Sequence, residues 1–564
     1  MSMDLKSERC DDIPLIWHGL KHMEIERIID ASCPLPHGNW QGLSYGQLSL
    51  LLLCYIITQS DHRLCAVEPW IEQHRQTLEK CSGWRIRPED GSDDRLAMVV
   101  EHLGADVERW ETIETALGQH LIGAYRLSTQ VARVDSTSFS VYHQVGADGP
   151  VEESLIRYGY SKDHRPDLAQ YRYMLGTLDP LGLPLVTQVL AGNGSDDSMY
   201  VESWERFERV VGHPGFIFVG DSKASALATR AQIHQRGGLY CMPLSQTGHT
   251  PLMLKQWVLH PPTPVEFIRL SHQDEDEPPI GIGFEIRLGK CWPSFDESER
   301  VTWEERYLVV HSYAVAQKEL ASFKTRLAKV ETGLARLAAK PVADRCEGEQ
   351  KAKALLKRHR LSDCFEIEMR PSRLTTRSSA GQDCSSSAQA KSAPSSFLLH
   401  FAPVLEHIQQ KKLLMGWRIY LTNASIEQLS LTQAIEHYRG QWQPERGFHR
   451  HKRGQLPALP IYFRNPDRIR GIMLVLSIAL RLFWLLEYQV RRTLDETGSA
   501  LAGLYDGNPR RTTQRPTTEA LLKAFGNITL YQLPDGSEFI TPLNPLQKII
   551  LKLLNIPELI YELG

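Results

Sequence analysis

The spacing of apolar residues separates a helical first part of the chain from a mixed part that follows it. Within residues 1–125, the apolar block 48–57 and the 3–4 spacing of residues 96–121 predict helices. At Val131 the pattern changes to β-branched and aromatic residues with period two, which is typical of strands. We therefore expect a helical N-terminal region followed by an α/β core.

The core begins with three predicted strands, at residues 131–142, 171–178 and 184–190. The last two are joined by the tight-turn sequence Asp-Pro-Leu-Gly, so the three strands are expected to form an antiparallel meander. Asp135 lies inside the first strand, on one face with Thr137 and Phe139. A carboxylate there needs either a metal ion or a hydrogen-bonding partner, and the residues leave both readings open.

Helices and strands alternate beyond the meander. Residues 199–211 predict a helix, residues 216–219 a buried strand, and residues 239–243 another strand. Asp221 follows the buried strand, and side chains at strand ends of open α/β sheets commonly bind ligands. The alternative is that Asp221 caps a helix that starts at Ser222.

Residues 245–415 are less regular. They contain three predicted strands and two predicted helices, at 265–270, 283–288, 305–310, 320–337 and 350–359. The first helix has a heptad seam that ends before Pro341, so the two helices are expected to form an antiparallel hairpin. The Ser-rich segment 371–396 predicts a disordered loop.

Order returns with a predicted strand at residues 417–422 and a charged stretch at residues 438–452. Read as one helix, this stretch places five residues on a single face. They are Tyr438, Gln441, Glu445, Phe448 and Lys452. Pro444 offers the alternative of a helix that starts nearer Glu445. A buried helix at residues 469–486 follows, then a basic polar linker at 508–515 and amphipathic helices.

Composition narrows the class of protein. The net charge of -3 over 564 residues gives no global polyanion-binding signature, so DNA contact would have to come from a local basic surface. Residues 439–470 offer one, with eight Lys and Arg against two acids. Ten scattered cysteines without a C-x-x-C pair suggest a reducing cytosol. Neither apolar run predicts a membrane span, and the first residues have no signal-peptide pattern.

The three acids Asp135, Asp221 and Glu445 lie on a strand, at a strand end, and on a helix beyond a long insertion. This arrangement resembles the Asp-Asp-Glu triad of the ribonuclease-H-like fold. More specifically, the chain resembles the DDE transposases of bacterial insertion sequences, of the insertion-sequence-4 and insertion-sequence-1634 kind. The polar loop at residues 159–167 and the Leu-Thr-Asn-Ala element at residues 421–424 also recur in that family.

The family signature is Tyr, two residues, Arg, three residues, Glu, six residues, Lys. Tyr438, Glu445 and Lys452 match its spacing, whereas Gln441 stands at the Arg position. The resemblance implies that Tyr438 and Lys452 contact DNA phosphate near the cleaved end. Arg439 or Arg446 would replace the missing Arg charge. Trp442 would stack on an unpaired base or, as an alternative, lie in the core.

The resemblance also implies a fold and its division along the chain. The expectation is a ribonuclease-H-like α/β core, a mixed sheet flanked by helices, in two parts at residues 126–244 and 416–490. An insertion domain at residues 245–415 would separate the two parts. A helical region would occupy residues 1–125 and serve in DNA binding or dimerisation or, as an equal alternative, as a plain structural cap. A helical tail would occupy residues 491–564.

The implied function is transposition. Two Mg²⁺ or Mn²⁺ ions held by Asp135, Asp221 and Glu445 would cleave insertion-sequence ends and join 3′-hydroxyl ends to target DNA. The implied partners are double-stranded terminal inverted repeats, target DNA and a second copy of the chain, in the bacterial cytoplasm and without a membrane. Two alternatives remain: an inactive DNA-binding derivative, and a metal-dependent nuclease without strand transfer.

Overall fold

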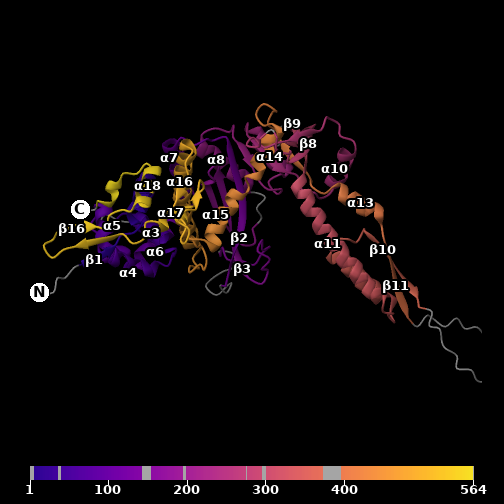
Figure 1. Ribbon diagram of the computed structural model, residues 1–564, viewed down its shortest axis with the longest axis horizontal. Helices are drawn as coiled ribbons and strands as arrows, with labels where there is room; N and C mark the ends of the chain where they lie inside the picture. Colours follow the sequence, from indigo (N-terminus) through magenta and orange to yellow (C-terminus); the bar gives the residue numbers. More distant parts are fainter. Residues whose placement is uncertain are drawn as a thin grey trace, which may run out of the picture.

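A nine-stranded mixed sheet organises the protein in the computed structural model (Figure 1). The structure describes residues 6–35, 40–142, 154–194, 199–274, 276–294, 300–372 and 396–562. The strand order is β4-β3-β2-β5-β6-β12-β9-β8-β7. Helices flank this sheet, so the architecture is mixed α/β as expected.

The predicted meander forms one end of the sheet. Strands β2 (Val131–Val141), β3 (Ala169–Leu178) and β4 (Leu183–Ala191) pair antiparallel in chain order. Every residue of β3 is buried. The reason is coverage on both faces, since Gly176 lies against Phe207 of helix α8 (Met199–Val211) and Leu175 lies against Gly447.

Parallel strands follow on the other side of β2. Strand β5 (Ile217–Val219) pairs parallel with β2, and β6 (Leu239–Pro243) pairs parallel with β5. Helix α9 (Leu227–Gln235) joins them and begins five residues later than the predicted start at Ser222. This prediction was wrong because residues 222–225 form a turn that Asp221 closes.

The sheet continues into the region predicted as an insertion. Strand β12 (Trp417–Thr422) pairs antiparallel with β6 and with β9 (Arg300–Ser312). Strands β8 (Gly281–Pro293) and β7 (Glu266–Ile268) complete that end, and helix α10 (Thr250–Leu259) precedes them. The chain beyond β9 then leaves the sheet and returns to it at β12.

Residues 313–415 form an arm that projects from the body (Figure 1). Its elements are α11 (Tyr313–Ala338), α12 (Arg345–Arg358), β10 (Phe365–Pro371), β11 (Phe397–Pro403) and α13 (Leu405–Leu413). The predicted helical hairpin is present, and the arm has its own small core around Phe323, Val330 and Leu356. Most of the predicted Ser-rich loop, residues 373–395, lies outside the described residues.

Helix α16 (Pro466–Thr497) lies between the sheet and the N-terminal helices (Figure 1). It is the one helix among the described residues that is long and apolar enough to cross a membrane, but 94% of its most apolar window is buried. Two glycines permit its close approach to α6 (Asp93–Gly104). A Cβ on Gly104 would lie 1.9 Å from the Asp467 carbonyl oxygen, and a Cβ on Gly471 would lie 1.8 Å from the Val100 carbonyl oxygen. The helices packed nearby are α1 (Ile13–His22), α2 (Ile25–Ser32), α3 (Tyr45–Gln59), α4 (Val67–Gln73), α5 (Arg75–Ser82), α6 (Asp93–Gly104) and α7 (Val107–Tyr125).

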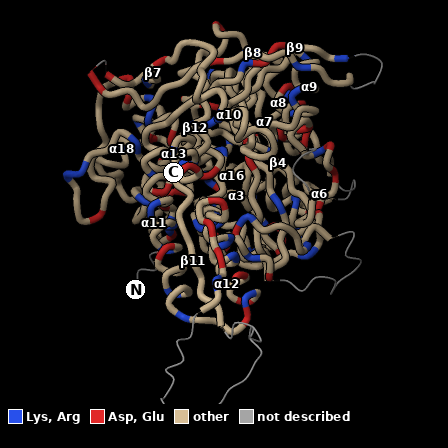
Figure 2. The backbone as a smooth tube through the Cα atoms, turned by 90° about the vertical axis from the view of Figure 1, so that its right-hand side faces the viewer, with Lys and Arg blue, Asp and Glu red and all other residues tan. Residues whose placement is uncertain are grey.

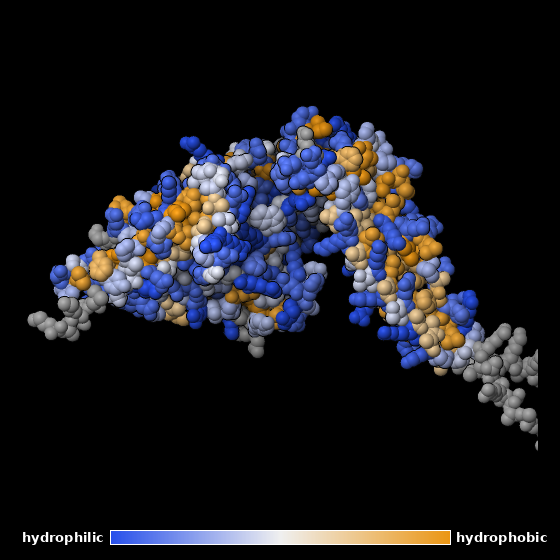
Figure 3. Space-filling view, in the orientation of Figure 1, coloured by the Kyte–Doolittle hydropathy of each residue, from blue (hydrophilic) through white to orange (hydrophobic). Residues whose placement is uncertain are grey.

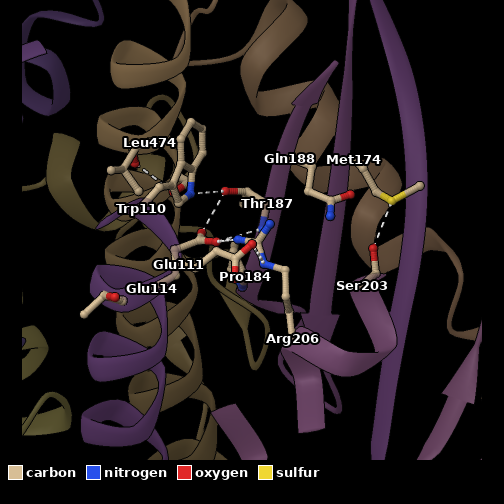
Figure 4. Close-up of polar contacts among 12 residues, drawn as sticks. Trp110, Glu111, Glu114, Met174, Pro184, Thr187, Gln188, Ser203, Arg206 and Leu474 are labelled. Atoms are coloured by element: carbon tan, nitrogen blue, oxygen red, sulfur yellow. Dashed lines mark hydrogen bonds and ion pairs between the residues drawn. The ribbon is translucent and has the colours of Figure 1, made fainter. Parts of the chain in front are cut away.

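A buried ionic network ties the N-terminal helices to the core (Figure 4). Glu114 of α7 accepts from Arg481 of α16 at 2.8 Å and from Arg206 of α8 at 2.7 Å. The Thr187 hydroxyl of β4 donates to the same carboxylate at 2.7 Å. The arginine that interrupts the apolar run of α16 is therefore fully buried and paired.

The C-terminal region is less helical than expected. Strand β15 (Thr529–Gln532) pairs antiparallel with β16 (Glu538–Ile540) and with β1 (Lys6–Arg9). Helices α17 (Thr518–Lys523) and α18 (Pro545–Leu553) flank this small sheet. The prediction of a helical tail was wrong. Residues of the tail form β15 and β16, and β15 also pairs with β1, which lies at the other end of the chain.

Candidate active site

The charged stretch at residues 438–452 is broken in two. Helix α14 (Leu431–Arg439) ends at Gly440, and helix α15 (Trp442–Arg453) begins two residues later. Pro444 lies in the first turn of α15. The N–H groups of a first turn have no partner within the helix, so proline there removes no helical hydrogen bond. The prediction of one helix with Tyr438 and Glu445 on a shared face was therefore wrong.

Arg133, on the strand that carries Asp135, fixes the position of this break. Its guanidinium is buried, donates to Asp179 at 2.6 Å from Nε, and donates to the His437 carbonyl from Nη1. A Cβ on Gly440 would lie 2.3 Å from Arg133 Nη2. Glycine at position 440 thus gives the guanidinium room to join β2 to the last turn of α14, just before α15.

Asp135 is largely buried in the middle of β2. The Ser136 N–H donates to its Oδ1 at 2.7 Å, and the Lys162 ammonium lies 3.9 Å from the same oxygen. Burial raises the pKa of Asp135 to about 6, Lys162 and the Ser136 N–H oppose that rise, and Asp221 and Glu445 add to it. Asp135 is therefore close enough to both other acids to feel their charge.

Asp221 follows β5, the strand next to β2. Its Oδ1 accepts from the Tyr200 hydroxyl at 2.7 Å, the Lys223 N–H at 2.9 Å and the Ala224 N–H at 3.3 Å. Its Oδ2 accepts no hydrogen bond from another described residue. The capping alternative holds for the turn, and it occupies only one of the two carboxylate oxygens.

Glu445 is exposed in the first turn of α15 and has neither an ion pair nor a hydrogen bond to a side chain that the structure describes. Its charge reaches Asp135, and the charges of Asp135 and Asp221 reach Tyr438. Segments separated by hundreds of residues therefore converge electrostatically. Within the described residues, no three Asp, Glu, His or Cys side chains are grouped closely enough to hold a metal ion as they stand.

Three of the residues predicted to bind DNA lie at or near the surface. Tyr438 is half-buried, with its ring centroid 4.7 Å from that of Tyr420, and burial followed by the Asp221 charge raises the pKa of its hydroxyl. Arg439 is exposed, and Trp442 is 48% exposed. The alternative of a buried core tryptophan at position 442 is thereby corrected.

Two other candidates face inward, which argues against contact with DNA. Arg446 donates to Glu487 of α16 at 2.6 Å and lies over the Trp484 ring at 5.0 Å. Both polar atoms of the Gln441 side chain are buried and form no hydrogen bond with a described residue. The residue at the family's Arg position is therefore enclosed, and Arg446 does not replace its charge at the surface.

Lys452 is paired rather than free. Its ammonium donates to both oxygens of Asp163, at 2.8 and 2.9 Å, and lies 5.6 Å from the Phe139 ring centroid. Asp163 belongs to the polar loop that follows β2, so Lys452 pairs with an acid on a neighbouring element. An exposed pair of this kind contributes about 0–1 kcal/mol, so another strong anion can compete for the ammonium.

The sequence interpretation gave no role to Lys162, the neighbour of Asp163. Its ammonium donates to the Ser136 carbonyl at 2.6 Å and to the Ser136 hydroxyl at 2.7 Å, beside Asp135. Consecutive loop residues therefore contact the strand of the first acid and the helix of the third. The recurring loop sequence Ser-Lys-Asp was the available signal, but it does not show which strand the lysine reaches.

Internal ion pairs neutralise much of the predicted basic surface at residues 439–470. Pairs with acids in the part of the chain that the structure describes occupy five of its Lys and Arg side chains: Arg446, Arg450, Lys452, Arg468 and Arg470. The basic surface is accordingly smaller than the sequence predicts, and exposed cations such as Arg439 and Arg453 carry more of it.

One comparison with known proteins bears on this arrangement. The family model described as a transposase DDE domain matches residues 126–482, which is more than half of the chain and includes all three acids. No curated protein matches the chain.

Proposed function

Because the chain belongs to the family of transposase DDE domains, we propose that it cleaves the ends of a bacterial insertion sequence and joins their 3′-hydroxyls to target DNA. We further propose the insertion-sequence-4 or insertion-sequence-1634 type and a ribonuclease-H-like core. The proposed partners are terminal inverted repeats, target DNA and a second copy of the chain, in the bacterial cytoplasm.

One observation carries the proposal: Asp135 is largely buried on β2 beside the strand that leads to Asp221, and while burial is the main cause that raises its pKa to about 6, the nearby charges of Asp221 and Glu445 add to that rise. The three residues come from adjacent parallel strands and from a helix beyond the arm. Three carboxylates repel one another in this partly buried place, and the one ammonium group described beside Asp135, that of Lys162, offsets part of their combined charge, so further positive charge is favoured there. Their convergence therefore supports a site that binds cations.

The donor set fits Mg²⁺ or Mn²⁺, which prefer carboxylate oxygens. Asp135, Asp221 through Oδ2, and Glu445 would hold the ions, and the carboxylates would have to move closer together to do so. When bound, two such ions activate the attacking hydroxyl and stabilise the leaving oxygen of a phosphodiester.

The surrounding residues have supporting roles in this proposal. The Tyr200 hydroxyl and the turn N–H groups orient Asp221, and Lys162 offsets part of the negative charge beside Asp135. Tyr438, Arg439, Trp442 and Lys452 would lie along the DNA end, with Lys452 exchanging Asp163 for a phosphate.

The test compares Asp135→Asn, Asp221→Asn and Glu445→Gln with Asp506→Asn, an exposed acid paired with Lys523. Labelled DNA ends, taken from inverted repeats that flank the gene, are incubated with Mg²⁺ or Mn²⁺ and a target plasmid. We expect each of the first three variants to bind DNA and lose both cleavage and joining, while Asp506→Asn retains both. Wild-type cleavage by any of the three would refute the site.

The same assay distinguishes the alternatives. Cleavage without joined product would indicate a nuclease without strand transfer. Specific binding of the ends by wild-type protein with neither cleavage nor joining would indicate an inactive DNA-binding derivative.

A further inference from the structure

A basic stripe runs along helix α11 of the arm. Lys318, Lys329 and Arg336 are exposed and separated by 11 and 7 residues, which are close to three and two helical turns. They consequently lie on one face of the helix, and Lys340 follows just beyond its end. The positions between them on this face are Ser322, Thr325 and Thr332, so no acid interrupts the stripe.

The stripe lies on the side of α11 opposite the core of the arm. Phe323, Val330 and Leu334 are buried against α12 and the β10–β11 hairpin. Summing 100° per residue places the stripe roughly 145° around the helix from these three. Neither the three stripe cations nor Lys340 forms an ion pair or a hydrogen bond with a side chain that the structure describes.

The local charge is opposite in sign to that of the whole chain. Helix α11 carries five Lys and Arg against two acids, whereas the net charge of the chain is -3. Of the two acids, Glu319 pairs with Arg418 of the body. Figure 2 shows the charged residues of the arm from its free side, and Figure 3 shows open space between the arm and the body.

We propose that this stripe of α11 is a second contact for duplex DNA, made to the phosphate backbone and independent of base sequence. From Lys318 to Arg336 the stripe extends about 27 Å, roughly three quarters of one turn of duplex at about 34–36 Å. A row of cations separated by neutral side chains can contact phosphates along the backbone. It has few groups that could form specific hydrogen bonds with base edges. The contact extends the proposed function, because DNA would be held by the arm as well as by the carboxylate site.

The test is DNA binding by a stripe variant, Lys318→Gln/Lys329→Gln/Arg336→Gln. The matched control is Lys351→Gln/Lys353→Gln/Arg370→Gln, which removes the same charge from the same arm. Each control residue already pairs with a glutamate, Glu347, Glu349 or Glu368. The probe is a fluorescent duplex of arbitrary sequence and about 40 base pairs, roughly four helical turns, in EDTA over a range of NaCl concentrations.

We expect the stripe variant to bind at least tenfold more weakly at moderate salt, with a log–log salt slope smaller by about 2.7 for three lost phosphate contacts. The control should stay within about twofold of wild type. Equal weakening of both variants, or an unchanged stripe variant, would overturn the proposal. Because the assay contains no divalent metal, failure of the proposed cleavage chemistry would leave this result unaffected.

Discussion

The guanidinium of Arg133 occupies the space where a side chain at Gly440 would begin, at 2.3 Å from an added Cβ. Arg133 is held there by Asp179 and by the His437 carbonyl, so it has little freedom to move away. The strand of Asp135 therefore meets the chain at the end of α14, two residues before the helix of Glu445 begins.

Gly440→Ala should accordingly destabilise the protein and impair DNA cleavage. Forcing a methyl group into a packed site costs about 1–3 kcal/mol and would displace α15, which carries Glu445. The control is Gly123→Ala in α7, where an added Cβ meets nothing within 4 Å and alanine favours the helix. Thermal unfolding and cleavage are measured together. If Gly440→Ala unfolds at the same temperature as the wild type, the Arg133 side chain can move aside at little cost in free energy.

The Lys452–Asp163 pair predicts a competition between the protein's own carboxylate and DNA. Lys452→Ala should weaken binding of DNA ends about tenfold or more, since charge-assisted contacts contribute roughly 1.5–3 kcal/mol, with little change in thermal stability. Asp163→Asn should tighten binding, because it frees the ammonium.

The double variant completes this test. Lys452→Ala/Asp163→Asn should bind like Lys452→Ala alone, and Lys452→Arg should retain part of the affinity. If Asp163→Asn weakens binding instead, Asp163 positions Lys452 for DNA rather than competing for it.

Glu114→Gln should strongly destabilise the protein. The substitution leaves Arg481 and Arg206 without their buried counter-charge, a change that costs about 3–5 kcal/mol. Glu205→Gln is the matched control, because Glu205 of α8 is 29% exposed and pairs with the exposed Arg236. The free energy of unfolding in denaturant is the measurement. Similar losses for the two variants would mean that water reaches the Glu114 network.

His451 predicts a loss of stability at acid pH. Burial lowers the pKa of this histidine from 6.5 to about 4, while its Nδ1 contacts the Leu456 carbonyl at 3.1 Å. The unfolded chain therefore takes up a proton first as the pH falls. The contribution of the neutral, buried His451 to the free energy of unfolding is complete above pH 6.5. It is lost progressively towards pH 4, by about 3 kcal/mol in total.

His451→Asn should flatten this dependence, because an asparagine amide can take the place of Nδ1 and does not titrate. The variant will be less stable at neutral pH, since it leaves space beside Tyr173. The informative quantity is the difference in unfolding midpoint between pH 7 and pH 4.5, which should be smaller than in wild type. If the difference in midpoint equals that of the wild type, groups other than His451 cause the loss of stability at acid pH.

Local patterns were sufficient to predict much of the fold. The meander, helix α8 and the short strand before Asp221 depend on period two, period 3.6 and turn residues, which act over a few positions. For the break at Gly440, Pro444 offered only the alternative of a helix that starts nearer Glu445, and the Arg133–His437 bond beside the break spans 304 residues, beyond the reach of a local pattern.

The candidate site likewise depends partly on local sequence, which could be interpreted, and partly on contacts between distant segments, which could not. The three acids could be chosen from their local context and from the family signature. The partners that occupy Lys452, Arg446 and Arg468 could not, because Asp163, Glu487 and Glu101 lie on distant segments. A count of charges along the sequence therefore overestimated the basic surface near Glu445.

The pairing of β1 with β15 has a consequence for synthesis. The hydroxyl of Tyr561 also donates to the Asp11 carbonyl at 2.9 Å, so both contacts join early residues to late ones. At about 5–20 residues per second, a ribosome needs on the order of half a minute to two minutes to make the intervening chain. During that interval β1 remains an unpaired edge, and β2 with Asp135 lacks α15, the later helix that packs against it. The nascent chain thus completes its N-terminal core only after residue 532 has emerged, and premature termination before that point would leave that strand open to aggregation.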